Sequence, residues 1–551
     1  MRATRLARGA AVRNPRKPQL PALDGVGHLE DVHPQRPPEG RRPEMDANNL
    51  YDVVDYPSGC HVQTHPSRLA AAAMLRGFEA VPTAGARIVE LGCGDGWNLI
   101  PIAEAFPECQ CFGIDLARKP IERGRAAIEQ LGLRNIRLQC GDVTELVGQL
   151  GTVDYIIAHG LYSWVPERVR ESILSLCGRM LSDRGLAFIS FNALPGSHGR
   201  MIVREMLQRH VGKVAGVEER LTQAQALLGF LHAGTEGAPG LRGVMRMEYE
   251  RLLKGDPAQL LHDELAEVND AFYFTDFMGR ASVHGLEFVT NAEVVDSGMS
   301  GFSAEVQEVL NGFGDDDLRR EQYIDYARLR PFRQVLLCRK GSFRRGNEDG
   351  TVADRLHVAG SLNPMETGVD LRPEVEVEFH GTTGKSIKTH NPAAKAALAL
   401  LSRSGLHPVP VAGVCRVAIE MLREAGIPAE PSEIRDFLVH SARLGLVTFW
   451  HHPPVTAQKP GLRPRASRLA RYQAIQGGLT TTAYHQRVDV SDPVLRRMIL
   501  LMDGERTIEG IIEELREAFG GDPQVVGAEF EVQAFRTLGL LASGGLLAAG
   551  E

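Results

Sequence analysis

The sequence alternates between short apolar runs and amphipathic segments, and this alternation sets the predicted fold. Apolar runs bounded by turn residues are typical of buried strands, and the segments between them repeat their apolar residues at helical spacing. Strands are predicted at 87–91, 110–114, 135–139, 153–158 and 185–191, and helices near 98–106, 117–131, 143–149 and 166–181. Strands that alternate with helices predict an α/β fold with a doubly wound, mostly parallel sheet.

Helical patterning also flanks this region. An alanine-rich helix is expected before the first strand, from about Ser67 to Phe78, with Ser67 or Thr64 as its N-cap. After the last strand, apolar residues recur at helical spacing through 200–232 and 241–254. These segments predict a mainly helical region that follows the sheet.

The sequence changes again after residue 340. Residues 341–384 are rich in Gly, Asp, Glu and Arg and contain two strand-like pieces, at 356–362 and 374–380. They indicate a linker with a small β element. From Pro392 the pattern is helical once more and shows a faint internal repeat.

The first 44 residues differ from all the rest. They hold nine Lys/Arg, five Asp/Glu and seven prolines, and no apolar run long enough for a signal peptide. Such a segment buries too little apolar surface to offset the entropy of ordering, so a disordered basic, proline-rich tail is predicted. The alternative is that Met45 is the true initiator; mass spectrometry of the native N-terminus distinguishes the two.

Composition narrows the class of protein. A chain of 551 residues implies three or four domains at about 100–200 residues each. The net charge of −7 argues against a general polyanion-binding surface. The eight cysteines form no C-x-x-C pair, so we expect buried thiols, no metal site and a reducing, cytoplasmic location. No run of 18 apolar residues occurs, so no membrane insertion is expected.

A glycine-dense turn follows the first predicted strand, in the sequence Glu90-Leu-Gly-Cys-Gly-Asp-Gly96. Glycine is needed where the backbone takes positive φ or approaches a ligand closely. The dinucleotide fingerprint G-x-G-x-x-G would place its last glycine at Trp97, which does not fit. The turn therefore favours a nucleoside ligand without a pyrophosphate, although a plain strand-to-helix turn is the alternative.

Acidic residues also follow the next two predicted strands. Asp115 ends the second strand and Gly141-Asp142 ends the third. Ligands of such sheets bind beyond the carboxyl ends of the strands, where a carboxylate can accept hydrogen bonds from ribose hydroxyls or from an adenine amine. One acid alone would be read as a helix cap, but three strand ends with acids in phase indicate a nucleoside site.

This set of residues resembles the class I S-adenosylmethionine-dependent methyltransferases over roughly residues 50–205. The resemblance implies a Rossmann-like, seven-stranded methyltransferase sheet and S-adenosyl-L-methionine as the cofactor. It also implies roles for the cofactor-binding candidates: the loop backbone would pass the methionine moiety, Glu90 would support its amino group, Asp115 would bind the ribose, and Asp142 would read the adenine. The candidates are Glu90, Gly92, Cys93, Gly94, Gly96, Asp115, Leu116, Asp142, Val143 and His159.

The residues expected to face the methyl acceptor form a less specific pattern than the cofactor-binding candidates. The loop after the fourth strand, His159-Gly-Leu-Tyr162-Ser-Trp164, would close over the sulfonium, so His159 and Tyr162 are the catalytic candidates. A hydrogen-bonding role for His159 and a core position for Tyr162 are the alternatives. The Asn-Pro-Pro-Tyr signature of amino-methylating DNA enzymes is absent, which argues against a nucleic-acid substrate.

Two further regions resemble domains found beside certain bacterial methyltransferases. The run from Leu261 to Arg339 closely resembles the methyltransferase regulatory domain, and the C-terminal region resembles paired winged helices of the rickettsial protein lysine methyltransferase group. The predicted domains are 1–44 (tail), 45–205 (methyltransferase), 206–340 (regulatory domain), 341–390 (linker) and 391–551 (two winged-helix-like modules). Phe332–Arg339 is expected to rejoin the catalytic sheet as an antiparallel edge.

Winged helices often bind DNA, but these modules lack the required charge. The helix Ile508–Phe519 carries four glutamates against Arg516, whereas nucleic-acid affinity depends on cationic contacts to phosphate. We therefore expect protein contact. The leading hypothesis is methyl transfer to a protein side chain, with lysine as a candidate acceptor; a small-molecule methyltransferase and a cofactor-binding scaffold without catalysis are the alternatives, and the oligomeric state stays open.

The assignment of Asp115 gives a first test. Asp115→Ala is expected to weaken S-adenosylmethionine binding by about 1–3 kcal/mol, because the ribose hydroxyls lose their acceptor. Isothermal titration calorimetry measures this change, and unchanged affinity would show that the site is misplaced.

Overall fold

The computed structural model describes residues 51–549 apart from 52, 147–149, 300, 344–349, 361, 366–367, 382–383 and 521–528. The expectation for residues 1–44 and the end of the helix near 143–149 therefore lie outside the described residues. No helix among those described is long and apolar enough to cross a membrane.

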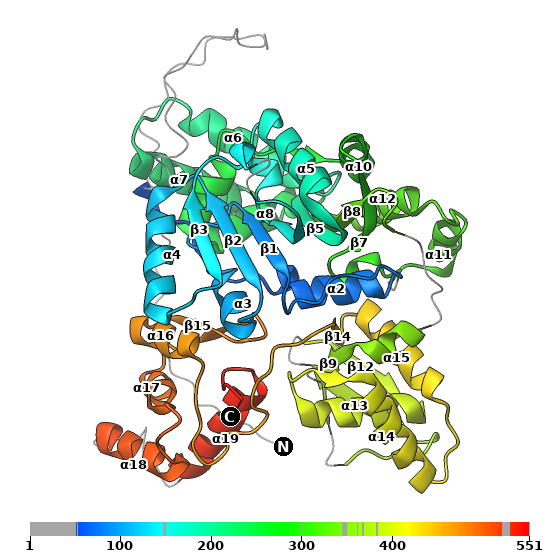
Figure 1. Cartoon of the computed structure of the whole chain (residues 1–551). Coiled ribbons are helices and arrows are strands. Elements are labelled where there is room, and N and C mark those ends of the chain that lie inside the picture. The colour runs from blue at the N-terminus through cyan, green and yellow to red at the C-terminus, as the bar shows by residue number, and fades with distance from the viewer. Residues whose placement is uncertain are drawn as a thin grey trace, which may run out of the picture. The chain divides into compact units, whose positions relative to one another are not determined.

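The sheet confirms the predicted fold class. Its strand order is β3-β2-β1-β4-β5-β8-β7, with a short β6 also paired to β5. The strands β1 to β5 pair in parallel, whereas β8 is antiparallel to both of its neighbours (Figure 1). Their bounds are β1 Arg87–Leu91, β2 Gln110–Asp115, β3 Ile136–Cys140, β4 Val153–Ala158, β5 Leu181–Ala193, β6 Ala271–Phe272, β7 Leu286–Asn291 and β8 Phe332–Arg339.

The last strand rejoins the sheet in a different position from the one expected. β8 pairs antiparallel with β5, but β7 pairs along its other side and forms the sheet edge. β8 is therefore an interior strand. The segment 286–291 gives no strand signal of comparable strength, because its buried and half-buried residues do not alternate.

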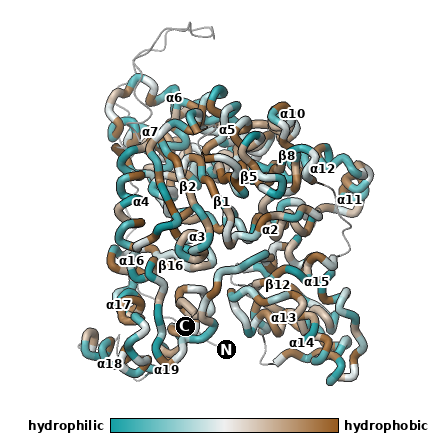
Figure 2. The backbone as a smooth tube through the Cα atoms, in the orientation of Figure 1, coloured by the Kyte–Doolittle hydropathy of each residue, from teal (hydrophilic) through white to brown (hydrophobic). Residues whose placement is uncertain are grey.

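Helices cover both faces of the sheet, and the strand side chains divide between two apolar cores. In β4, Tyr155 and Ile157 point into one core while Ile156 and Ala158 point into the other, as the two-residue repeat of a strand requires. Figure 2 shows β1, β2 and β5 as mainly hydrophobic and α4 as largely hydrophilic. The first core includes α2 (Pro66–Met74), α3 (Ile100–Ala105) and α4 (Arg118–Leu131); the second includes α5 (Glu167–Met180) and α10 (Phe274–Val283).

The N-cap of α2 differs from both expected residues. His65 is the cap, and its ring Nδ1 accepts a hydrogen bond from the backbone N–H of Ser67 at 3.2 Å. Pro66 occupies the first helical position, where proline is favoured. Ser67 therefore lies inside the helix rather than before it, and Thr64 ends a separate short turn, η1 (Val62–Thr64).

Residues 199–265 form a compact unit of their own. Three long helices make up most of it, as the helical spacing predicts: α6 (His198–Val211), α7 (Val217–Gly234) and α8 (Leu241–Lys254). The short α9 (Pro257–Gln259) and a π-helical turn η4 (Leu260–Glu264) follow. Within this unit Arg200 pairs with Asp263 and Glu264, so the acidic residues of η4 serve as ion-pair partners.

The C-terminal region contains two helical modules with small β elements. In the first, strand β9 (His357–Ala359) from the linker lies between β13 (Val409–Pro410) and β14 (Thr448–Trp450). The helices of this module are α13 (Pro392–Ser404), α14 (Val411–Glu424) and α15 (Pro431–Arg443). A second small sheet joins β10 (Leu362–Pro364), β11 (Val377–Gly381) and β12 (Ser386–Thr389).

The second module has a hairpin between its first two helices. Strands β15 (Leu479–Thr481) and β16 (Arg487–Asp489) pair antiparallel. The helices are α16 (Arg468–Gln476), α17 (Pro493–Leu501), α18 (Ile508–Phe519) and α19 (Phe530–Ser543). Their apolar faces form a separate core, which explains why the pattern after residue 392 repeats.

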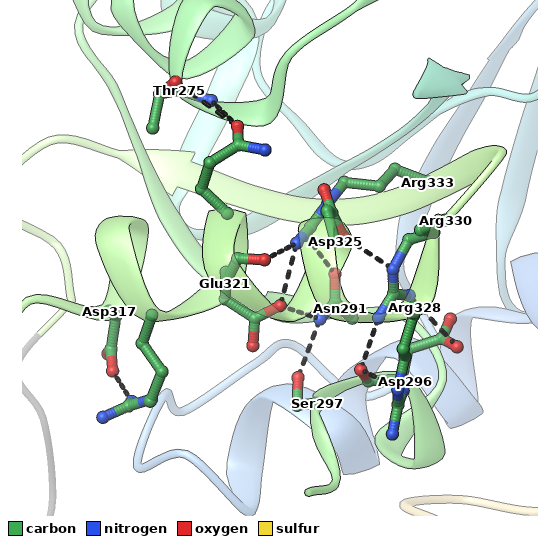
Figure 3. A network of polar contacts seen from close by, with 12 residues as sticks. Thr275, Asn291, Asp296, Ser297, Asp317, Glu321, Asp325, Arg328, Arg330 and Arg333 are labelled. Atoms are coloured by element: carbon green, nitrogen blue, oxygen red, sulfur yellow. Dashed lines mark hydrogen bonds and ion pairs between the residues drawn. The ribbon is translucent and has the colours of Figure 1, made fainter. Parts of the chain in front are cut away.

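A buried ionic network ties β8 to the helix α12 (Asp317–Arg328) (Figure 3). The fully buried Arg333 guanidinium pairs with Asp325 at 2.6 Å and Glu321 at 3.0 Å and donates to Asn291 at 2.8 Å. Its guanidinium carbon also lies 3.9 Å from the ring centroid of Phe274. Asp325 and Glu321 belong to α12, Asn291 to β7 and Phe274 to α10, so Arg333 fixes α12, α10 and β7 together.

We expect Arg333→Met to lower the free energy of unfolding by about 3–5 kcal/mol, because Asp325 and Glu321 would remain buried without their cation. Thermal unfolding followed by circular dichroism measures the loss. The matched control is Arg339→Met on the same strand, since the exposed Arg339–Asp183 pair contributes about 0–1 kcal/mol. Equal destabilisation by the two variants would contradict the role of the network.

Candidate active site

The glycine turn adopts a backbone that its glycines make possible. Gly92, Gly94 and Gly96 have φ values of +74°, +54° and +79°, a region that other residues rarely adopt. The amides of Gly92 and Cys93 both donate to the Ile114 carbonyl, which fixes the turn against β2. The Cys93 thiol is buried beneath the turn rather than directed at a ligand-facing surface.

Two of these glycines also lie where a side chain would matter. A Cβ added to Gly96 would approach Leu138 Cδ1 to 2.8 Å, whereas one added to Gly94 would project into open space. A Cβ on Gly92 would lie 3.2 Å from Leu161, in the loop after β4. The turn thus packs against Leu138 at Gly96 and against the β4 loop at Gly92. At Gly94 it faces open space.

Glu90 lies buried at the end of β1. Its Oε1 accepts a hydrogen bond from Asn98 Nδ2 at 2.7 Å, while Oε2 is buried with no hydrogen-bond partner within the described part of the chain. Burial raises the pKa of this carboxyl to about 8, and Asn98 opposes that shift. A cationic group beside Oε2 would stabilise the ionised form, so this oxygen fits an ammonium group of a ligand.

Asp115 ends β2 beside the glycine turn. Its Oδ2 accepts from the Gly94 N–H at 2.9 Å and its Oδ1 from the Ala117 N–H at 2.8 Å. Each carboxylate oxygen has two lone pairs, so both can accept a further hydrogen bond. The next residue, Leu116, is 48% exposed and is therefore available for a hydrophobic contact with a planar base.

Asp142 and Val143 follow β3. Asp142 is the N-cap of the short turn η2 (Val143–Glu145), and its Oδ1 accepts from the Thr144 N–H at 2.8 Å. The Val143 side chain packs in the second core. The acid therefore has the capping role of the alternative interpretation and retains acceptor capacity on its other oxygen.

His159 begins the loop after β4 and lies among other rings. The His61 ring is 4.2 Å away between centroids, Phe188 is 5.8 Å away and Phe332 is 6.2 Å away. Its Nδ1 is 3.1 Å from Ser190 Oγ, which also accepts from the Gly160 N–H at 2.8 Å. Burial lowers the pKa of His159 to about 3 and that of His61 to about 4, so both imidazoles are neutral at pH 7.

The Tyr162 side chain has no exposed surface, whereas a catalytic side chain must reach the substrate. It is fully buried in the turn η3 (Tyr162–Trp164), and its ring contacts Phe191, Phe272 and Phe277. Burial raises the pKa of its phenol to about 12. This placement favours the interpretation of Tyr162 as a core aromatic residue.

Two residues of the site carry too weak a sequence signal to be chosen. Asn98 is a single polar residue after Trp97 in an amphipathic segment, and His61 is an isolated histidine before the predicted helix, so neither gives a signal of its own. In the structure the Asn98 amide bonds Glu90, Thr64 Oγ1 at 3.0 Å and the His61 N–H at 2.9 Å. The segment before α2 therefore packs directly against Asn98, next to the glycine turn.

The domains match known families in the order in which they occur. A methyltransferase domain family matches residues 88–185, the methyltransferase regulatory domain family matches 256–339, and the PKMT C-terminal winged helix domain family matches 463–527. The chain belongs to the S-adenosylmethionine-dependent methyltransferases that combine these domains, with S-adenosylmethionine as methyl donor.

Particular relatives extend the match over most of the chain. The uncharacterized protein RP789 of Rickettsia prowazekii is 30% identical over 482 residues, covering 85% of this chain and 86% of RP789. A second uncharacterized protein of that organism, RP028, is 34% identical over 42% of this chain and 93% of its own length. The structure of PKMT2 from Rickettsia typhi in complex with AdoHcy has the same fold, with a TM-score of 0.80, 23% identity, and coverage of 90% of this chain and 100% of PKMT2.

The raised pKa of Glu90 gives a pH-dependent prediction for the protein without cofactor. The folded protein keeps the proton of Glu90 up to about pH 8, whereas the unfolded chain releases it near 4.5. Between these values the unfolded state binds fewer protons, so stability falls as pH rises, by up to about 1.4 kcal/mol per pH unit.

Glu90→Gln removes this titration and is expected to unfold at a higher temperature than the wild type at pH 8, with a smaller difference at pH 5. Differential scanning calorimetry at both pH values measures the effect. The exposed Glu108→Gln is the control, and a Glu90→Gln difference that does not grow with pH would contradict the assignment.

Proposed function

We propose that this enzyme methylates a protein side chain, with the amino group of lysine as the acceptor. In this proposal the methyl donor occupies the end of the parallel strands. Glu90 faces its methionine ammonium, Asp115 its ribose, and Leu116 and Asp142 its adenine. The observation that supports the donor site best is the buried Glu90 Oε2, which has no hydrogen-bond partner among the described residues and lies beside a turn that is open at Gly94.

The reaction requires alignment more than activation. The lone pair of an uncharged amine attacks the methyl carbon in line, the carbon–sulfur bond breaks towards sulfur, and the products are S-adenosylhomocysteine and the methylated amine. The amine must reach the site without its extra proton, which it leaves in solvent. The protein contributes positioning and exclusion of water.

The acceptor side suits an uncharged amine. His61 and His159 are neutral by burial, and Phe188 and Phe332 complete the wall around His159. None of these four side chains is an anion, so this wall offers no counter-ion that would keep an ammonium protonated. An imidazole lone pair can instead accept an N–H from the amine and direct the nitrogen lone pair towards the methyl group.

A protein acceptor is supported by the appended domains. The C-terminal family match is to the winged helix domain of PKMT proteins, and the fold of PKMT2 extends over the catalytic, regulatory and C-terminal parts alike. The α18 helix of the second module carries Glu509, Glu513, Glu514 and Glu517, so it is unsuited to phosphate contacts.

Transfer of labelled methyl groups from S-adenosylmethionine to a cell lysate tests the proposal. We expect label in the protein fraction, and in methyl-lysine after complete hydrolysis. Label confined to the low-mass fraction would defeat the protein acceptor, and label in another amino acid would defeat lysine.

His159→Ala is expected to lower kcat by about 10–100-fold, since a displaced acceptor loses its alignment with the methyl group. The Kd for S-adenosylhomocysteine should change far less. The exposed His452→Ala serves as the control. A loss that falls on cofactor binding instead of kcat would place His159 at the donor rather than the acceptor.

A further inference from the structure

The hairpin between β15 and β16 reaches the donor site of the catalytic domain. His485, in the connection between these strands, is 1% exposed, and its ring Nε2 lies 3.0 Å from Asn98 Oδ1. These two residues are 387 positions apart in the chain. Asn98 in turn donates to Glu90, so a buried chain of polar contacts links the C-terminal region to the donor site.

The contacts of Asn98 determine how its amide is oriented. The backbone N–H of His61 can only donate, so the atom that faces it at 2.9 Å must be the carbonyl Oδ1. His485 meets the same oxygen and must therefore donate, with its proton on Nε2. The amide nitrogen is left to donate to Glu90 at 2.7 Å and to Thr64 at 3.0 Å.

Contacts with the rest of the C-terminal region and with the segment before α2 hold the hairpin in place. Ala483 donates its N–H to the Gly545 carbonyl at 2.9 Å, and the Tyr484 hydroxyl contacts Thr456 and His407, each at 2.6 Å. The Cys60 thiol donates to the His485 carbonyl at 3.3 Å, which holds the segment before α2 against the hairpin. The position of the His485 ring is thus determined by the folded C-terminal module.

The backbone of His485 adds an independent indication. Its φ is +62°, one of two positive values for non-glycine residues in the described part of the chain. Such residues are strained, and the strain persists only where the surrounding structure imposes it. Here it accompanies a side chain that is directed into the catalytic domain rather than into solvent.

We propose that His485 is a positioning residue for the methyl donor. By holding Asn98 it directs the amide N–H onto Glu90 Oε1 and leaves Oε2 for the methionine ammonium, so the C-terminal region completes the donor site. This inference rests on the role proposed above for Glu90. It assigns to the winged-helix region a part in cofactor binding, in addition to any contact with the acceptor protein.

Two substitutions of His485 distinguish a role in positioning Asn98 from a role in packing. In His485→Gln the side-chain amide can place a donor where the imidazole Nε2 lies, whereas in His485→Asn the donor falls short of Asn98. Asparagine tolerates positive φ well, so backbone strain does not explain a loss in that variant. We expect the Kd for S-adenosylhomocysteine to rise about tenfold in His485→Asn and to stay near the wild-type value in His485→Gln.

Calorimetric titration of the full chain with S-adenosylhomocysteine measures these values without an acceptor, so failure of the lysine proposal leaves the test intact. Leu479→Ala is the matched control, because it changes an exposed side chain of the same hairpin, and it should bind as the wild type does. Equal losses in Leu479→Ala and His485→Asn, or wild-type affinity in a folded His485→Asn, would overturn the inference. Asn98→Ala breaks the same link from the catalytic side, and wild-type affinity there would also overturn it.

A double-mutant cycle with Glu90→Gln completes the test. If His485 acts through Glu90, its substitution should have little further effect once Glu90 is replaced. Fully additive losses would mean that His485 acts by another route and would overturn the inference while leaving the donor site intact. An unchanged Kd in Glu90→Gln alone would instead refute the proposed role of Glu90, and the inference with it.

Discussion

The burial of one carboxyl group, Glu90, is the constraint around which the catalytic part of this enzyme is arranged. The group lies at the end of β1 behind a turn that only glycine can form, and the Asn98 amide satisfies one of its oxygens. A buried acid with an open oxygen is unfavourable in the free protein, and that same burial strengthens its interaction with a bound cation. This burial therefore lowers the stability of the protein without cofactor, and in the proposed donor site it strengthens binding of the methionine ammonium.

Arg333, a buried cation of the same sheet, differs from the Glu90 carboxyl because its polar partners all lie within the protein. Arg333 meets two carboxylates, an amide and an aromatic face, so its charge is fully compensated by the protein. It lies on β8, whose first residue, Phe332, faces His159. The regulatory-domain segment thus supplies the strand that lies beside His159, and Arg333 anchors that strand, which gives the Arg-Pro-Phe-Arg sequence at 330–333 a physical reason.

Much of the fold followed from the sequence because its signals are local. Each parallel strand begins or ends within a few residues of its predicted position, and the glycine turn takes the expected backbone. The features that the sequence did not predict depend on contacts between residues far apart in the chain. The edge position of β7, the capping of α2 by His65, and the bond between Asn98 and His485 each join residues whose own sequence gives no sign of the partner.

The candidate site shows the same division. Glu90, Asp115 and Asp142 were found because each follows a strand in phase with the others, and the structure places each at a strand end. His61 and Asn98 were missed because an isolated histidine or asparagine has no periodic signal. Tyr162 was chosen from its place in the β4 loop, but the aromatic residues that enclose it come from β5, β6 and α10, which no local pattern could reveal.

The interior position of β8 has a consequence for synthesis of the chain on the ribosome. After β5 has emerged, β6 can pair only with its last residues, Asn192 and Ala193, so residues 187–191 wait for residues 332–339, and the helical unit 199–265 is translated before them. During that interval a long apolar strand presents unpaired backbone groups, the kind of edge that recruits other chains. The nascent enzyme therefore passes through a stage at which chaperone protection of β5 would matter more than at any later point.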